Sequence, residues 1–111
     1  MEAISYKYLN YWWIPDSEID PSQASEDYFK VFYDDHDRYI IVERYDVDHH
    51  LKSHDRFFWD GSTLAKVEVY EPNGSLLKYI IYHYGRNGEL TGRDHYSPEG
   101  KLLLSEPADS S

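Results

Sequence analysis

Imidazole and carboxylate side chains are most concentrated in one ten-residue stretch of this chain. It contains Asp46, Asp48, His49, His50, His54 and Asp55. Side chains of these two types bind zinc and other divalent cations. However, His49 and His50 are adjacent, so an extended backbone would direct them to opposite sides, and they fall in a predicted turn. We therefore interpret the stretch as a solvated acidic turn and predict no metal ligand, with a metal-binding protein or enzyme as an alternative.

Two smaller groupings contain acid–base side chains. His83, Tyr84 and His95 would approach one another if the last hairpins pair, but no nucleophile or second carboxylate accompanies them. Glu43 and Glu68 flank one predicted strand, where neighbouring basic side chains would neutralise them in cross-strand ion pairs. No glycine-rich loop precedes a helix, as a phosphate site would require. The sequence therefore predicts a non-enzymatic protein with no catalytic residue and no cofactor.

A short repeat must position all of these side chains. An aromatic residue is followed four positions later by a turn residue and two further on by leucine, as in Tyr70, Gly74 and Leu76. The turn residue recurs at positions 37, 49, 61, 74, 88 and 100. Glycine, asparagine, aspartate and histidine are the residues that most readily adopt the positive φ of a tight turn. A period of about 12 residues holds one strand and one turn.

The segments between these turns are rich in aromatic and β-branched residues, which predicts strands. They are Ile4–Trp13, Tyr28–Tyr33, Arg38–Asp46, Leu51–Trp59, Thr63–Glu71, Leu76–Tyr84, Leu90–Tyr96 and Lys101–Ser105. Short connections require antiparallel pairing, so we predict an all-β antiparallel meander of about eight strands. With no helix to cover it, the sheet should curl strongly or close partly into a barrel. The expected inward residues are Phe29, Val31, Tyr33, Ile41, Phe58, Leu64, Leu77 and Ile81.

The domain boundaries follow from the same pattern. Residues 1–105 should form a single domain, because 111 residues can build only one core. Residues 15–27 are rich in Pro, Ser, Asp and Glu and should be an irregular loop, with a helical turn around Pro21–Glu26. Residues 106–111 are predicted to be a disordered tail. The outermost strands could pair between copies, so we expect a monomer or a homodimer.

Charge and composition restrict the kinds of partner. The chain has a net charge of −10 and no cysteine, and residues 16–55 alone carry twelve acids and four bases. That field repels nucleic acid and anionic membranes and attracts basic proteins. A secretory signal and an apolar stretch long enough to span a bilayer are both lacking, so a cytoplasmic location is expected. The chain contains twelve tyrosines and three tryptophans, and these two residue types are enriched in recognition surfaces.

Two resemblances bear on these hairpins. The segments Tyr70–Leu76 and Tyr84–Leu90 resemble the tyrosine-aspartate hairpin repeats of Rhs-type toxins and the MORN-like repeats of some antitoxin proteins. A longer stretch, roughly Ile4 to Leu77, resembles a family of short bacterial proteins known only as a domain of unknown function. That likeness is carried by Tyr28–Asp34, Val42–Tyr45, Asp55–Phe57 and Lys66–Tyr70. The chain departs from it at Asp37 and His49, where the family has glycine, and the resemblance implies no activity.

The leading hypothesis from the sequence is a small acidic binding protein. We expect an immunity protein or antitoxin that neutralises a basic bacterial toxin by direct contact, because acidic side chains speed association and aromatic side chains stabilise the contact. The predicted contact residues are Asp34, Asp35, Asp37, Asp46 and Asp48 for steering, with Tyr39 and Tyr45 as anchors. The alternative is a phage-type DNA mimic that inhibits a host defence nuclease. Mimicry requires a one-sided row of carboxylates, whereas the acids here cluster at turns.

Overall fold

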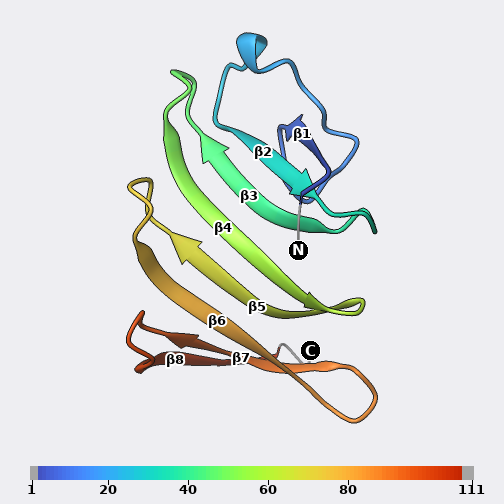
Figure 1. The fold of residues 1–111 in the computed structure, drawn as a ribbon, viewed down its shortest axis with the longest axis vertical. Helices are drawn as coiled ribbons and strands as arrows, with labels where there is room; N and C mark the ends of the chain where they lie inside the picture. The colour runs from blue at the N-terminus through green and yellow to red at the C-terminus, as the bar shows by residue number, and fades with distance from the viewer. Residues whose placement is uncertain (1–2, 109–111) are drawn as a thin grey trace.

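A computed structural model describes residues 3–108 as one eight-stranded sheet with one short 3₁₀ helix, η1 (Pro21–Gln23). Every strand pairs antiparallel with the next one in the sequence (Figure 1). The strands are β1 (Ser5–Leu9), β2 (Tyr28–Tyr33), β3 (Tyr39–Tyr45), β4 (Leu51–Asp60), β5 (Thr63–Tyr70), β6 (Leu76–Tyr84), β7 (Leu90–Tyr96) and β8 (Leu102–Pro107). The predicted all-β antiparallel meander is therefore confirmed.

The sheet is open, so the partly closed barrel, one of the two forms predicted, is wrong. Closure would require β1 to pair with β8, and these two strands are instead the opposite edges of the sheet. Strand direction rotates progressively across the sheet, so that β7 and β8 run at a steep angle to β4 (Figure 1). Part of the outer edge of β1 is already occupied, because Leu9 forms a bridge with Glu18. The sheet therefore departs from a flat layer by twisting and not by closing.

Several element boundaries differ from those predicted. The first strand ends at Leu9 rather than Trp13, because the chain turns and the N–H of Ile14 donates to the C=O of Tyr11 at 3.0 Å. The 3₁₀ helix lies where a helical turn was expected. β8 continues through Pro107, into the segment expected to be a tail, and residues 109–111 lie outside the described part of the chain. No helix in residues 3–108 is long and apolar enough to cross a membrane.

Five of the six hairpin turns share one backbone geometry. In the turn after β2, the N–H of Asp34 donates to the C=O of Arg38 at 3.0 Å, and the N–H of Asp37 donates to the C=O of Asp34 at 3.2 Å. Both bonds recur in the four turns that follow β3, β5, β6 and β7. The fourth turn residue has positive φ in each case: Asp37 (60°), His49 (65°), Gly74 (92°), Gly88 (79°) and Gly100 (92°). Gly61, at 61°, serves the shorter turn between β4 and β5.

A β-bulge lies next to each of these turns and was not predicted. Phe32 pairs with Ile41 while Tyr33 pairs with Tyr39, which leaves Ile40 unopposed. The registers of the other hairpins leave one unopposed residue each: Lys52, Ala65, Leu77, Thr91 and Leu103. A bulge interrupts the two-residue alternation of side chains and increases the local twist. The recurring bulge therefore accounts for both the coiling of the sheet and the difficulty of assigning its faces.

The hydrophobic core lies on one face of β1 to β5, which we call the core face. Its buried members are Leu9, Val31, Tyr33, Val42, Phe57 and Val67. Trp12 covers this cluster from the segment after β1, with its ring 5.3 Å from Tyr39 and 5.7 Å from Phe57. Of the expected inward residues, Phe29, Val31, Tyr33 and Leu64 belong to the core or pack against it.

The other four expected inward residues lie on the opposite face, which we call the outer face. Ile41, Phe58 and Ile81 occupy register positions that alternate with core residues, and Leu77 is 51% exposed at a bulge. Phe57, rather than Phe58, enters the core. A face assigned on one side of a bulge does not carry over to the next strand, which is the physical reason for the error.

The shared turn geometry gives a test of backbone strain. Asp37 occupies the left-handed region at φ 60°, where a side chain is disfavoured and glycine is not. We expect Asp37→Gly to raise the free energy of unfolding by roughly 0.5–1 kcal/mol in urea titrations. Asp35→Gly, in the same turn but without positive φ, should instead lower it, because glycine there only increases the entropy of the unfolded chain. Equal effects of the two variants would contradict this account.

Candidate protein-docking surface

The acids predicted to steer a partner lie at opposite ends of the sheet. Asp34, Asp35 and Asp37 belong to the turn between β2 and β3, and Asp46 and Asp48 belong to the turn between β3 and β4. These two turns are at the two ends of β3 (Figure 1). The structure therefore does not bring the five acids into a single contact surface.

Asp34 stabilises its own turn and is not available to a partner. Its side chain is 1% exposed. Oδ1 accepts the N–H groups of His36 at 2.8 Å and Arg38 at 3.0 Å, and Oδ2 accepts Nε of Arg38 at 2.9 Å. Burial by itself raises the pKa of the Asp34 carboxyl, but these N–H groups and the guanidinium charge outweigh it and lower the pKa. Asp35 and Asp37 of the same turn are exposed to solvent.

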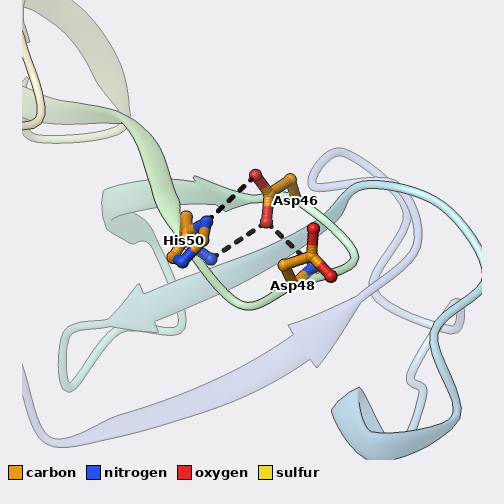
Figure 2. Close-up of side chains that lie close together, drawn as sticks. All are labelled: Asp46, Asp48 and His50. Carbon is orange, nitrogen blue, oxygen red and sulfur yellow. Dashed lines mark hydrogen bonds and ion pairs between the residues drawn. The ribbon is translucent and has the colours of Figure 1, made fainter.

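Asp46 repeats this arrangement in the next turn, as Figure 2 shows. Its Oδ1 accepts the N–H groups of Asp48 at 2.9 Å and His50 at 3.0 Å, and its Oδ2 lies 3.7 Å from Nδ1 of His50 and 4.0 Å from Nζ of Lys52. The bond from His50 N–H is the main cause of the lowered pKa of Asp46. Ligand atoms of Asp46, Asp48 and His50 lie within 4.8 Å of one another. In this geometry the carboxylate at the centre is already held by the turn and faces a lysine.

The remaining members of the histidine–aspartate stretch point elsewhere. Nδ1 of His49 lies 2.7 Å from the hydroxyl of Tyr28, and Nδ1 of His54 lies 2.8 Å from Oε2 of Glu43. Asp55 projects on the core face, where burial raises the pKa of its carboxyl and Oδ1 has no hydrogen-bond partner. Of the six residues that are dense in the sequence, Asp46, Asp48 and His50 lie together, and the other three make separate local contacts.

The two predicted tyrosine anchors are packed on opposite faces of β3. The ring of Tyr39 contacts Phe57 edge-on at 4.9 Å within the core. Tyr45 stacks on Tyr28 at 5.6 Å on the outer face and donates its hydroxyl to Oε1 of Glu43 at 3.0 Å. Burial and the Glu43 carboxylate raise the pKa of Tyr45 to about 12. Because the two rings face opposite directions, they cannot anchor the same partner surface.

The outer face largely pairs its own charges and rings. Nζ of Lys30 lies 4.4 Å from the ring centre of Tyr6, a cation–π contact. Nζ of Lys66 lies 3.3 Å from Oε2 of Glu68, whose Oε1 accepts the hydroxyl of Tyr70 at 2.7 Å. Contacts of this kind, within β5 and between β1 and β2, give a mixed surface of paired charges and rings.

The second acid–base grouping is also dispersed. Nε2 of His83 lies 2.9 Å from Oδ2 of Asp94 on the outer face. His95 is buried on the core face, where its Nε2 contacts Glu106, and Tyr84 donates its hydroxyl to a backbone carbonyl of β5. These residues therefore do not form one acid–base site, and each contact stabilises the pairing of neighbouring strands.

A shallow groove beside the irregular loop combines exposed rings with exposed carboxylates. Its volume is about 460 Å³, and its lining residues are Asn10, Tyr11, Trp13, Glu26, Asp27 and Phe29. Trp13 is 58% exposed, and its ring lies 5.4 Å from that of Tyr11. Glu26 and Asp27 are exposed where the chain enters β2. Aromatic faces and carboxylates together are complementary to the cationic side chains lysine and arginine.

Sequence reasoning missed this groove because it placed Trp13 inside a strand. The available signal was the aromatic run at Tyr11–Trp13, followed within two residues by Pro15 and then by an acid-rich loop, which indicates a chain reversal bearing exposed rings. Comparison of the chain with protein-family models, with curated proteins and with solved structures finds no match. The family resemblance drawn from the sequence stays a prediction.

Proposed function

We propose that this chain is a small acidic protein-binding module of the immunity-protein or antitoxin type, which neutralises a basic bacterial toxin by direct contact. The observation that supports this proposal is the groove where Tyr11 and Trp13 meet Glu26 and Asp27. Such a groove accepts a lysine or arginine side chain of the partner and places it against both an aromatic face and a carboxylate.

The distribution of charge favours a partner at this end of the sheet. Residues 16–55 carry a net charge of −8 of the total of −10, and they comprise most of the irregular loop together with β2, β3 and part of β4. Long-range attraction therefore directs a basic protein toward the region that contains the groove. A cation–π contact contributes about 0.5–2 kcal/mol, depending on how far it is desolvated. The acidic charge therefore determines the association rate, and the aromatic rings determine the dissociation rate.

The proposal is tested by capturing the partner from the native bacterium and measuring its association with variants of the groove. A toxin encoded beside this gene is the first candidate. We expect Glu26→Lys combined with Asp27→Lys to slow association at least about tenfold at low salt, and the deficit to shrink as salt screens the charges. Trp13→Ala should leave the association rate nearly unchanged and accelerate dissociation.

Asp35→Lys provides the control matched in charge to Glu26→Lys or Asp27→Lys made singly, since Asp35 is an exposed acid at the other end of β2. It should slow association less than the groove variants do, because it lies farther from the docked cation. A partner that is acidic, or that binds all of these variants as it binds the native chain, would overturn the proposal. Growth protection by co-expression with the captured partner would distinguish neutralisation of a toxin from simple binding.

A further inference from the structure

The last strand exposes an apolar edge. β8 pairs only with β7, so its other side is an edge of the sheet. It begins with three consecutive leucines, Leu102, Leu103 and Leu104, which are 52%, 56% and 53% exposed. Exposed apolar edge strands readily pair with strands of another chain. Within residues 3–108, this edge is therefore a candidate for pairing with a strand of another chain.

The backbone of β8 also has hydrogen-bonding groups directed to the open side. The N–H of Ala108 donates to the C=O of Thr91, at 3.1 Å, which directs residue 108 toward β7. By the two-residue alternation of an antiparallel ladder, the backbone N–H and C=O groups of Glu106 and Leu104 also point toward β7. Those of Ser105 point outward, to the open side. An added strand would satisfy these groups and cover the leucines.

We propose that the added strand is β8 of a second copy of this chain, paired antiparallel about a two-fold axis to give one continuous sheet. Self-pairing places unlike charges near each other, because Lys101 precedes the leucine run and Glu106, which also contacts Arg93 and His95 of β7, follows it. Antiparallel pairing brings Lys101 of each copy alongside the Glu106 end of the other. The contact is isologous, so the same surface is used on both copies.

Two further observations favour a second copy over open-ended growth. The acidic half of the chain lies toward the β1 edge, whereas residues outside 16–55 carry a net charge of only −2, so two copies approach through β8 with little repulsion. The other edge is partly occupied, because Leu9 of β1 bridges Glu18 and the N–H of Ile19 donates to the C=O of Tyr8. Head-to-tail pairing of β8 with β1 is therefore disfavoured, and assembly ends at the dimer.

Sedimentation velocity of the purified chain tests this proposal. At roughly 100 µM we expect a species of twice the 13.2 kDa of one chain, dissociating on dilution. Leu103→Lys should weaken the dimer at least about tenfold, because it places two charges in the paired edge. Leu77→Lys is the matched control, because Leu77 is the corresponding bulge leucine of β6, is 51% exposed, and lies inside the sheet rather than at its edge.

A second measurement covers the case in which Leu103→Lys fails to fold. The chain has no cysteine, so a single Leu104→Cys substitution reports on the contact alone. Mild oxidation should join two copies through residue 104, whereas Leu77→Cys should remain mostly uncoupled. A monomer at the highest concentration would overturn the proposal, as would a dimer that Leu103→Lys leaves intact. Neither outcome bears on the groove or its basic partner.

Discussion

Asp34→Ala is expected to lower the Tm by about 10 °C or more, because the variant loses the acceptor that closes the turn between β2 and β3. The native carboxylate accepts two backbone N–H groups and the guanidinium of Arg38 while itself almost fully buried. Removing it takes away the shared acceptor of these groups next to the core strand β2, and loss of a buried, charged hydrogen-bond acceptor is among the costlier defects in a folded protein. Thermal unfolding followed by circular dichroism measures the effect.

The same carboxylate gives the stability a pH dependence of defined sign. The pKa of Asp34 is lower in the folded chain than its ordinary value of 3.8, so the folded state binds protons less readily than the unfolded state does. The contribution of Asp34 is therefore complete above the unfolded pKa and is lost as the pH falls through the lower folded pKa. In Asp34→Asn, which cannot ionise, the difference in Tm from the native chain should be large at neutral pH and shrink in acid.

Two neighbouring acids serve as controls for Asp34. Asp35→Ala removes an exposed carboxylate from the same turn and should change the Tm little. Asp46→Ala removes the equivalent acceptor from the next turn, where the side chain is more exposed, and should have an intermediate effect. If all three substitutions had equal effects, the assignment of Asp34 as a buried turn acceptor would be wrong.

Leu9→Ala is expected to lower the free energy of unfolding by about 3 kcal/mol, a large part of the total for a domain of this size. Leu9 is 0% exposed and belongs to the only cluster of buried apolar residues within residues 3–108. Its truncation leaves a cavity in this cluster and weakens the strand with which the Glu18 segment pairs. Urea unfolding with an unchanged m-value would identify the loss as one of native packing.

Leu77→Ala is the matched control for Leu9→Ala, because it removes the same atoms from an exposed position. It should alter the free energy of unfolding by no more than about 0.5 kcal/mol. Comparable losses at both positions would show that the core does not lie on the face assigned to it.

The turns and strands could be predicted because their chemistry is local. Positive φ at a fixed place in each hairpin selects glycine, or at Asp37 and His49 a polar residue that tolerates it, and the spacing of these residues then determines the meander. Which side chains face inward depends on the bulges, and the unopposed residue has no common type, being Ile40 in one hairpin, Lys52 in another and Thr91 in a third. Phe57 and Phe58 are chemically identical neighbours, and only the register determines that Phe57 enters the core.

The candidate site was harder to predict for a related reason. Asp34 and Asp35 look alike in the sequence, yet one carboxylate is enclosed by backbone N–H groups and the other is in solvent. Charge alone therefore predicted a basic partner without identifying the contact residues. Trp12 and Trp13 likewise differ only in which side of the chain reversal they occupy, and one covers the core while the other lines the groove.

Because the hydrophobic core lies near one edge of the sheet, the strands differ in local stability. Buried apolar side chains are concentrated in β1 to β5, and Ile80 and Tyr82 of β6 pack against them. Each strand is hydrogen-bonded only to its neighbours, so β7 and β8 depend on contacts transmitted through β6. Local unfolding of such a sheet should start at β8 and stop where the apolar cluster begins. The N-terminal strands, which carry most of the acidic charge, are thus the more stable part of the sheet. The leucine edge belongs to the part that unfolds locally first.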